Sequence, residues 1–182
     1  MADQYISHKK RAIAHVMNHI KRGLDRATII VETSARRNVS PGGPSGFKTS
    51  RGSGGLRGSI GREVDMRSLR GFVGTNLRYG RIHELGGVIN PKNSQWLTIP
   101  VTDEARKARG ATYMDDLNFI PLSSEKALLA RSDDNFELDV QFVLVKSVTI
   151  PARPYLRPAL YKNKDKITKA LTRPLPPVPG VN

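Results

Sequence analysis

The stretch LDVQFVLVKSVTI, residues 138–150, decides the fold because it is the strongest β segment in the chain. Its valines, isoleucine and phenylalanine favour extended backbone over helix. Pro151 ends the strand, since proline has no N–H to donate to the hydrogen-bond ladder. The residues that follow predict a final helix that begins around residues 155–157. The apolar face of that helix carries Leu156, Leu160, Ile167 and Leu171.

The middle of the chain, upstream of this strand, is rich in further β signals. Short apolar runs bounded by glycines and polar turns predict five more strands. These strands are Leu56–Ile60, Gly71–Thr75, Trp96–Val101, Leu117–Leu122 and Ala127–Arg131. Asp133-Asp134-Asn135 predicts a turn. Two short helices are also expected: Tyr79–Leu85, which stops at Gly86-Gly87, and DEARKARG, which Thr102 caps.

The N-terminal region has the pattern of one long amphipathic helix, from about Gln4 to about Thr33. A helix of this length extends roughly 40 Å at 1.5 Å per residue. Two interpretations are open: the helix lies across a sheet of its own domain, or it extends beyond that domain to contact a neighbour. Its apolar side chains recur at three- and four-residue steps and form one stripe. They are Ile13, Val16, Met17, Ile20, Leu24, Ala27 and Val31.

The composition changes abruptly after this helix. Residues 34–55 consist mainly of Ser, Gly, Pro and Arg, which predicts a long mobile loop that orders against a partner. Residues 174–182, PLPPVPGVN, predict an extended Pro-rich tail. We therefore expect a single α+β domain over residues 1–173. In it, an antiparallel β-sheet packs with the long N-terminal helix and the C-terminal helix.

The charge balance says what kind of partner to expect. Thirty Lys and Arg against sixteen Asp and Glu give a net charge of +14. This excess favours nucleic acid or an acidic protein surface as a partner. No run of eighteen apolar residues and no secretory pattern is present, so we expect neither membrane association nor export. The lack of cysteine excludes disulfides and thiolate metal sites.

Catalytic motifs are largely missing, so we expect no enzyme, no metal and no cofactor. The chain has neither a phosphate-binding P-loop motif nor the Gly-x-Ser-x-Gly turn of serine hydrolases. His83-Glu84 begins like a zinc-protease helix, but Gly87 stands where the second histidine is required. His15 and His19 are one helical turn apart and have the spacing of a metal pair. The simpler interpretation is that His15 and His19 are ordinary surface or interface residues that flank the apolar stripe.

Three stretches carry a resemblance to a known group of proteins. They are GGLRGSI at residues 54–60, VGTNLRYGRIHELGGVI at 73–89 and VTIPARPYLRPAL at 148–160. Together they resemble the tail-completion and neck proteins of long-tailed phages, of the Mu-like virion morphogenesis type and the head–tail joining type. WLTIPVTDEARKAR, residues 96–109, resembles an insertion found in many members. The resemblance covers residues 1–172, apart from residues 34–53.

The resemblance implies a non-enzymatic α+β subunit that assembles into a ring, typically of six identical copies. The ring would terminate the tail tube, or stand one layer nearer the head as a neck protein; we favour the terminator. Its partners would be identical copies, the tail tube protein and head-closure proteins, with non-specific contact to passing genome DNA. It would assemble in the host bacterial cytoplasm and reside in the virion.

Two groups of side chains are candidate contact residues. The first is an expected ring interface, in which Arg81 and Glu84 are available for contacts with another subunit. Arg153 and Arg157 either take part in these contacts or cap carbonyls within their own chain. This first group comprises Tyr79, Arg81, His83, Glu84, Arg153, Tyr155 and Arg157. The second is an expected partner-ordered basic loop. It comprises Arg36, Arg37, Lys48, Arg51 and Arg57.

Two other functions compete with this interpretation. A basic DNA-binding accessory protein would bind duplex as a monomer or dimer, with affinity that falls steeply with salt. A small hydrolase would use His83 and Glu84, although the second histidine is missing.

Overall fold

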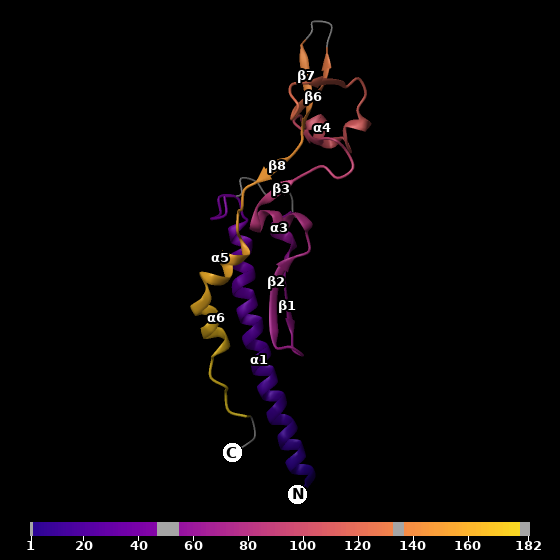
Figure 1. Ribbon diagram of the computed structural model, residues 1–182. Helices are drawn as coiled ribbons and strands as arrows, with labels where there is room; N and C mark the ends of the chain where they lie inside the picture. The colour runs from indigo at the N-terminus through magenta and orange to yellow at the C-terminus, as the bar shows by residue number, and fades with distance from the viewer. Residues whose placement is uncertain (1, 47–54, 133–136, 179–182) are drawn as a thin grey trace. The chain divides into compact units, whose positions relative to one another are not determined.

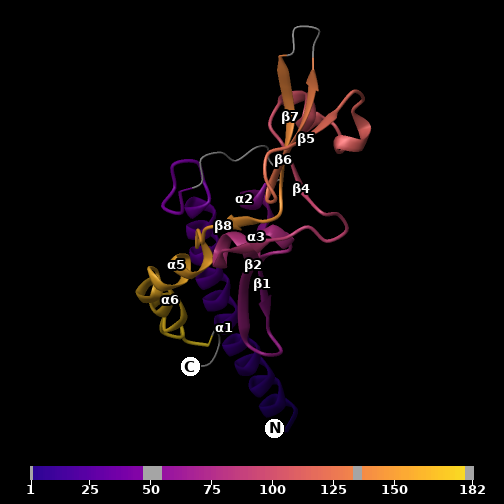
Figure 2. The same cartoon turned by 45° about the horizontal axis from the view of Figure 1, so that its top comes forward.

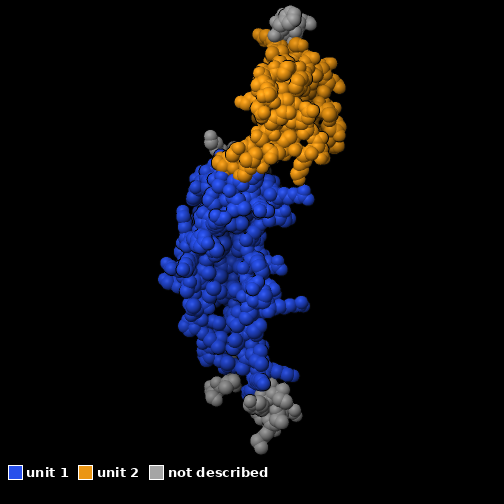
Figure 3. All heavy atoms as spheres, viewed as in Figure 1, with its two compact units in different colours: residues 1–86, 152–182 blue, residues 87–151 orange. Residues whose placement is uncertain are grey.

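The computed structural model describes residues 2–46, 55–132 and 137–178, with side chains from residue 8 onward (Figure 1). The chain belongs to the α+β class, as expected, and its paired strands are antiparallel. It forms two compact units (Figure 3). Unit 1 comprises residues 1–86 and 152–182, and unit 2 comprises residues 87–151. The range for which we expected a single domain thus holds two units, with unit 2 inserted into the chain of unit 1.

Helix α1 spans Ala2–Asn38 and is the longest element of unit 1. It continues past the expected end at Thr33, so the first five residues of the predicted 34–55 loop are helical. The reason is tertiary packing: Ala35 is fully buried, and the Asn38 side chain donates to the backbone carbonyl of Tyr155 at 2.8 Å. Of the remaining predicted loop, residues 39–46 form turns, and residues 47–54 lie outside the described residues.

A hairpin of β1, Ile60–Asp65, and β2, Arg70–Thr75, packs against α1. Figures 1 and 2 show the hairpin on one side of α1 and the C-terminal helices on the other. The expected strand at Leu56–Ile60 is wrong for its first four residues, which form the short helix α2, Leu56–Ser59. Burial of Leu56 holds this helical turn in place. Helix α3, Arg78–Leu85, ends at Gly86 in the left-handed region, as predicted.

The predicted final helix is divided into α5, Leu156–Tyr161, and α6, Lys164–Leu171. At the break, the Asn163 amide donates to Ser34 Oγ at 3.1 Å and to the Ala159 carbonyl at 2.8 Å, which ties the bend to α1. Residues 173–178 have no regular secondary structure. The core of unit 1 lies between α1, the hairpin and α5. It comprises Val31, Ala35, Val39, Leu56, Ile60, Tyr155 and Ala159.

Ion pairs fasten the hairpin to α1 beside this core. Arg62 on β1 contacts Glu32 at 3.1 Å and Asp25 at 3.6 Å. Arg36 contacts Glu32 at 2.8 Å and donates to the Ile60 carbonyl at 2.7 Å. These links fix the position of β1 along the helix.

Unit 2 contains two antiparallel sheets, and the segment of residues 137–150 contributes a strand to each. Strand β7, Leu138–Val145, lies inside a four-stranded sheet of order β4-β7-β6-β5, and β8, Val148–Ile150, pairs with β3, Gly87–Ile89. The predicted strands near 97, 118 and 127 are confirmed as β4, Leu97–Pro100, β5, Asn118–Pro121, and β6, Lys126–Ser132. The predicted turn at 133–135 lies outside the described residues. Phe142, Leu144, Ala127 and Ala130 form buried positions of the sheet.

The short helix of unit 2 is capped as predicted. Helix α4, Asp103–Lys107, begins where Thr102 Oγ1 accepts the backbone N–H of Ala105 at 3.0 Å. Ala111–Tyr113 follows as a single 3₁₀ turn. Glu104 on α4 binds Arg131 on β6 through two bonds of 2.9 and 3.1 Å, which joins the helix to the sheet.

Gly80 allows α3 to approach the core of unit 1 closely, which yields a prediction for stability. A Cβ at this position would lie 2.5 Å from Thr75 Cγ2 and 2.9 Å from the Tyr155 hydroxyl. Alanine normally favours a helix over glycine, but this overlap outweighs that preference. We expect Gly80→Ala to lower the free energy of unfolding by about 2 kcal/mol, measured by urea denaturation.

Gly74→Ala on β2 is the matched control, because nothing lies within 4 Å of a Cβ there. Its effect should stay below about 1 kcal/mol. If Gly80→Ala proved as stable as the wild type, the close packing of α3 described above would be contradicted.

Candidate assembly surface of unit 1

Glu84 on α3 caps the N-terminus of α5. Its Oε2 accepts the backbone N–H groups of Tyr155 at 2.7 Å and Leu156 at 2.8 Å, and its Oε1 accepts that of Arg157 at 2.9 Å. The first N–H groups of a helix lack partners within the helix, and a carboxylate there also interacts favourably with the helix dipole. A second link, from the Arg153 N–H to the His83 carbonyl at 2.7 Å, lies beside the cap. Glu84 is therefore engaged inside unit 1, and the prediction that it is available for contacts is wrong.

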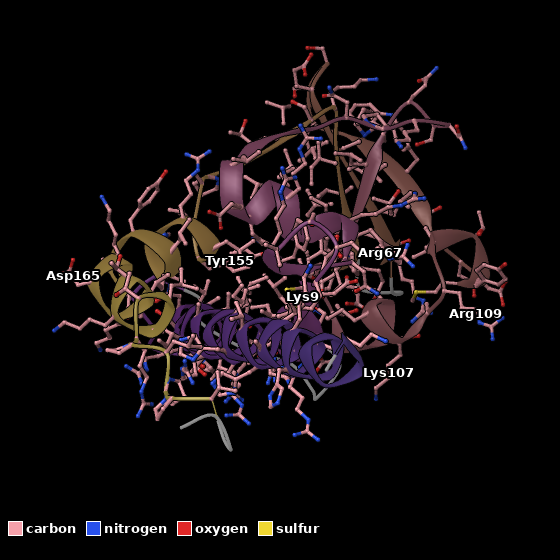
Figure 4. All side chains as sticks on the ribbon, turned by 90° about the horizontal axis from the view of Figure 1, so that it is seen from below. Lys9, Arg67, Lys107, Arg109, Tyr155 and Asp165 are labelled. Carbon is pink, nitrogen blue, oxygen red and sulfur yellow. The ribbon has the colours of Figure 1, made fainter. Side chains whose placement is uncertain are left out.

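Tyr155, which Figure 4 labels, anchors the same joint from the inside. Its side chain is 1% exposed. Its hydroxyl donates to the Gly80 carbonyl at 3.4 Å. Burial raises the pKa of the Tyr155 phenol to about 12, and the nearby Glu84 carboxylate adds to that rise. Burial likewise lowers the pKa of the His83 imidazole, with a further contribution from the positive charge of Arg153. Tyr155 thus belongs to the core and not to an interface.

The other members of the predicted interface group differ in position. Tyr79 is exposed, and its ring meets that of His83 edge to face with centroids 6.0 Å apart. Arg81 and Arg157 are exposed, whereas His83 and Arg153 are half-buried. The structure brings all seven together around the α3–α5 joint, and Tyr155 is the one member that is fully buried.

The structure describes three of the five predicted basic loop residues. Arg36 and Arg37 lie on the last turn of α1, and Arg36 is held by Glu32 and the Ile60 carbonyl. Arg57 is exposed on α2. Lys48 and Arg51 lie outside the described residues.

Half of the apolar stripe of α1 is open. Ala27, Val31 and Ala35 are 7%, 9% and 0% exposed, because the hairpin and α5 cover them. Further towards the N-terminus, Ile13 and Val16 are 54% and 40% exposed, and Met17 is also exposed. A shallow hollow marks this surface, which we call the open stripe; among the described side chains it is lined by Ala12, Ile13, Val16 and Met17. Our contact groups omitted these residues, although the repeat that predicted the helix already contained three of them.

Positive charge surrounds the open stripe. Lys9, Lys10 and Arg11 are exposed on its N-terminal side (Figure 4 labels Lys9). Residues 8–24 contain no Asp or Glu. The next carboxylate after this run, Asp25, contacts Lys21 at 2.9 Å and Arg62 at 3.6 Å. A partner of the open stripe therefore meets basic charge without nearby acidic groups to offset it.

The C-terminal segment runs along another flank of α1, where it contacts His15 and His19. His15 Nε2 contacts the Pro176 carbonyl at 2.9 Å, and His19 Nε2 contacts the Arg173 carbonyl at 2.8 Å. These histidines therefore hold backbone in place. Among the residues that the structure describes, no group of three or more metal-ligating side chains gathers. Within the same residues, no helix is long and apolar enough to cross a membrane.

A second apolar surface of unit 1 is a cleft of about 520 Å³ between α1, β2 and the C-terminal helices. Leu24, Ala27 and Val31 of α1 line it on one side, and Phe72 of β2 and Leu160 of α5 leave about half of their surface exposed at its rim. The cleft continues the line of the open stripe along α1.

Comparison of the chain with protein-family models, curated proteins and solved structures yields no match.

Removing the carboxylate cap should destabilise unit 1. We expect Glu84→Ala to lower the free energy of unfolding by about 2 kcal/mol, since three backbone N–H groups lose a charged acceptor. Glu84→Gln should also destabilise, because its amide NH₂ group would face these donors. Urea denaturation followed by circular dichroism measures both changes.

The control is Glu63→Ala, which removes an exposed carboxylate on β1 and should change stability by less than about 0.5 kcal/mol. Equal stability of Glu84→Ala and Glu63→Ala would show that the cap contributes nothing.

The pKa of Tyr155 predicts how stability depends on alkaline pH. The folded chain favours the neutral phenol, because the pKa rises from 10.0 in the unfolded chain to about 12. This contribution is fully present below pH 10 and is lost as the pH rises towards about 12. Tyr155→Phe cannot ionise, so we expect its unfolding midpoint to fall less steeply across this window. Identical slopes for the variant and the wild type would contradict the assignment.

Proposed function

We propose that the chain is a structural subunit of a tailed-phage virion, located at the head–tail junction. It forms a ring of identical copies that terminates the tail tube and joins it to the head. The observation that carries the joining role in this proposal is the open stripe, a surface available to an adjoining virion component. The rest of the chain covers half of the apolar face of α1, and the other half is exposed. An exposed apolar face of this kind is typical of a surface that docks onto a partner.

The α3–α5 joint supports the proposal from a second direction. The two most specific stretches of the phage-protein resemblance are residues 73–89 and 148–160. Glu84 from the first bonds directly to three backbone groups of the second. Their co-occurrence therefore has a physical reason, since each stretch needs the other to form the joint.

The basic surface supports contacts with neighbouring virion components. Acidic faces of adjoining protein rings, or genome DNA passing through the centre, would both be attracted to a subunit with a net charge of +14. Neither contact requires reading of base sequence. A neck ring one layer nearer the head would have the same properties and is the alternative placement.

A DNA-binding accessory protein is the second candidate function. The acid-free run of residues 8–24, with five Lys and Arg, is the observation that favours it. Exposed apolar side chains in the middle of that run favour a protein partner instead, because duplex DNA presents phosphate and not an apolar surface along its backbone.

Deletion of the gene in the phage that encodes this chain tests the function. We expect filled heads and separate tails to accumulate, as seen by negative-stain microscopy, and wild-type protein to restore complete particles. A doubly substituted chain, Ile13→Glu with Met17→Glu, should fold but fail to restore them, because charge on the open stripe prevents docking.

Tyr161→Ser is the matched control, since Tyr161 is 70% exposed on α5 and lies away from the stripe. It should restore particles as the wild type does. Complete particles in the absence of the gene, or heads that fail to fill with DNA, would contradict a joining role.

A further inference from the structure

We propose that the open stripe binds an acidic amphipathic helix of a different protein, and not the same segment of a second copy. The proposal rests on the proposed function in one respect: it takes the stripe as a contact between unlike virion components. It adds the chemistry of the partner, which the function alone does not specify.

The spacing of the stripe indicates that its partner is a helix. Ile13, Met17, Ile20 and Leu24 follow steps of four, three and four residues, which is the core repeat of a coiled coil. Such a seam receives side chains that a second helix presents at the same repeat. The seam is continuous with the covered half of α1, where elements of the same chain already occupy it. A partner helix would extend that packing towards the N-terminus.

Residues 173–176 of this chain's tail leave the seam free. His15 and His19 hold the backbone at Pro176 and Arg173, and both histidines lie on the flank of α1 away from Ile13 and Met17. Ile13 and Val16 stay exposed with the tail in this position. The occupant is therefore not residues 173–176 of the same chain.

The basic charge of residues 8–24 disfavours a second copy of the same segment. In the coiled-coil repeat, Lys10 takes a core position and Lys9 the position that flanks it. Two parallel copies would bring Lys10 against Lys10. Because residues 8–24 contain no acidic side chain, an antiparallel pair would also join basic segments without compensating charge. A helix with Glu or Asp beside its apolar face removes this repulsion and gains attraction.

An anionic membrane surface is the other conceivable target of a basic amphipathic helix. Residues 8–24 contain no Trp, Phe or Tyr, the side chains that typically insert at a bilayer interface. The open part of the stripe is also short, since Ile13 to Ile20 spans about 10 Å. The observations therefore favour a protein helix.

Two designed peptides test the proposal with the full-length protein. Both are helical, about three heptads long, with Leu at the core positions; one carries Glu and the other Lys at the flanking positions. Fluorescence anisotropy at low salt should show the acidic peptide binding at least about tenfold more tightly than the basic one. Its affinity should fall as the salt concentration rises.

Charge reversal provides the sharpest result. We expect the double variant Lys9→Glu with Lys10→Glu to lose about tenfold in affinity for the acidic peptide and to gain binding of the basic one. Ile13→Ser with Met17→Ser should weaken binding of both peptides. Matched controls on exposed positions of α6 and α5, Lys164→Glu with Lys166→Glu and Tyr161→Ser, should leave both affinities unchanged.

Three outcomes would overturn the proposal. The first is equal affinity for the two peptides. The second is binding to vesicles of phosphatidylglycerol and phosphatidylcholine that Ile13→Ser with Met17→Ser abolishes. The third is self-association of the wild type that the same variant abolishes, which would make a second copy the occupant.

These results are separable from the proposed function. If peptide binding fails but gene deletion still leaves heads and tails apart, the joining role stands and only the partner's chemistry is wrong. If peptide binding follows the charges but particles form without the gene, the surface stands and the virion role fails.

Discussion

The architecture of unit 1 depends on the hydrogen bonds between the Glu84 carboxylate and the backbone N–H groups at the start of α5. The chain leaves unit 1 after Gly86, forms unit 2, and returns at Ala152. Glu84 and the His83 carbonyl lie just before the exit and bind the backbone of Arg153 and Tyr155 just after the return. These bonds hold the two ends of the insertion together. The insertion therefore need not contribute to the core of unit 1, since the core residue Tyr155 is positioned by the joint itself.

One apolar stripe on α1 has two different fates, and this division gives the protein its candidate docking surface. The C-terminal half of the stripe forms the core with Leu56, Ile60 and Tyr155. The N-terminal half remains open beside Lys9 and Lys10. Two acidic residues of the covered half, Asp25 and Glu32, form ion pairs with Arg62 and Arg36. The open half therefore presents exposed apolar side chains next to basic residues that have no acidic neighbour within residues 8–24.

Side chains that have catalytic potential elsewhere hold backbone in this fold. Glu84 binds three N–H groups, and His15 and His19 bind carbonyls of the C-terminal segment. A carboxylate turned towards a helix N-terminus satisfies that helix and is poorly placed to act as a base on a substrate. These three side chains therefore serve the packing of unit 1.

Local patterns were sufficient to predict much of the secondary structure. The repeat of α1, the glycine stop of α3, the threonine cap of α4 and strands β4, β5 and β6 depend on neighbouring residues, so the linear sequence contains the information. The predicted single strand over 138–150 is instead divided into β7 and β8, which belong to different sheets, and β3 was not predicted. Burial of Ala35 extends α1, burial of Leu56 turns an expected strand into α2, and the choice of Glu84 as an internal cap depends on residues more than seventy positions away. The exposure of Ile13 and Met17 likewise depends on tertiary packing. Periodicity identifies which side chains share a helical face, but only the packing of distant elements decides which part of that face is covered.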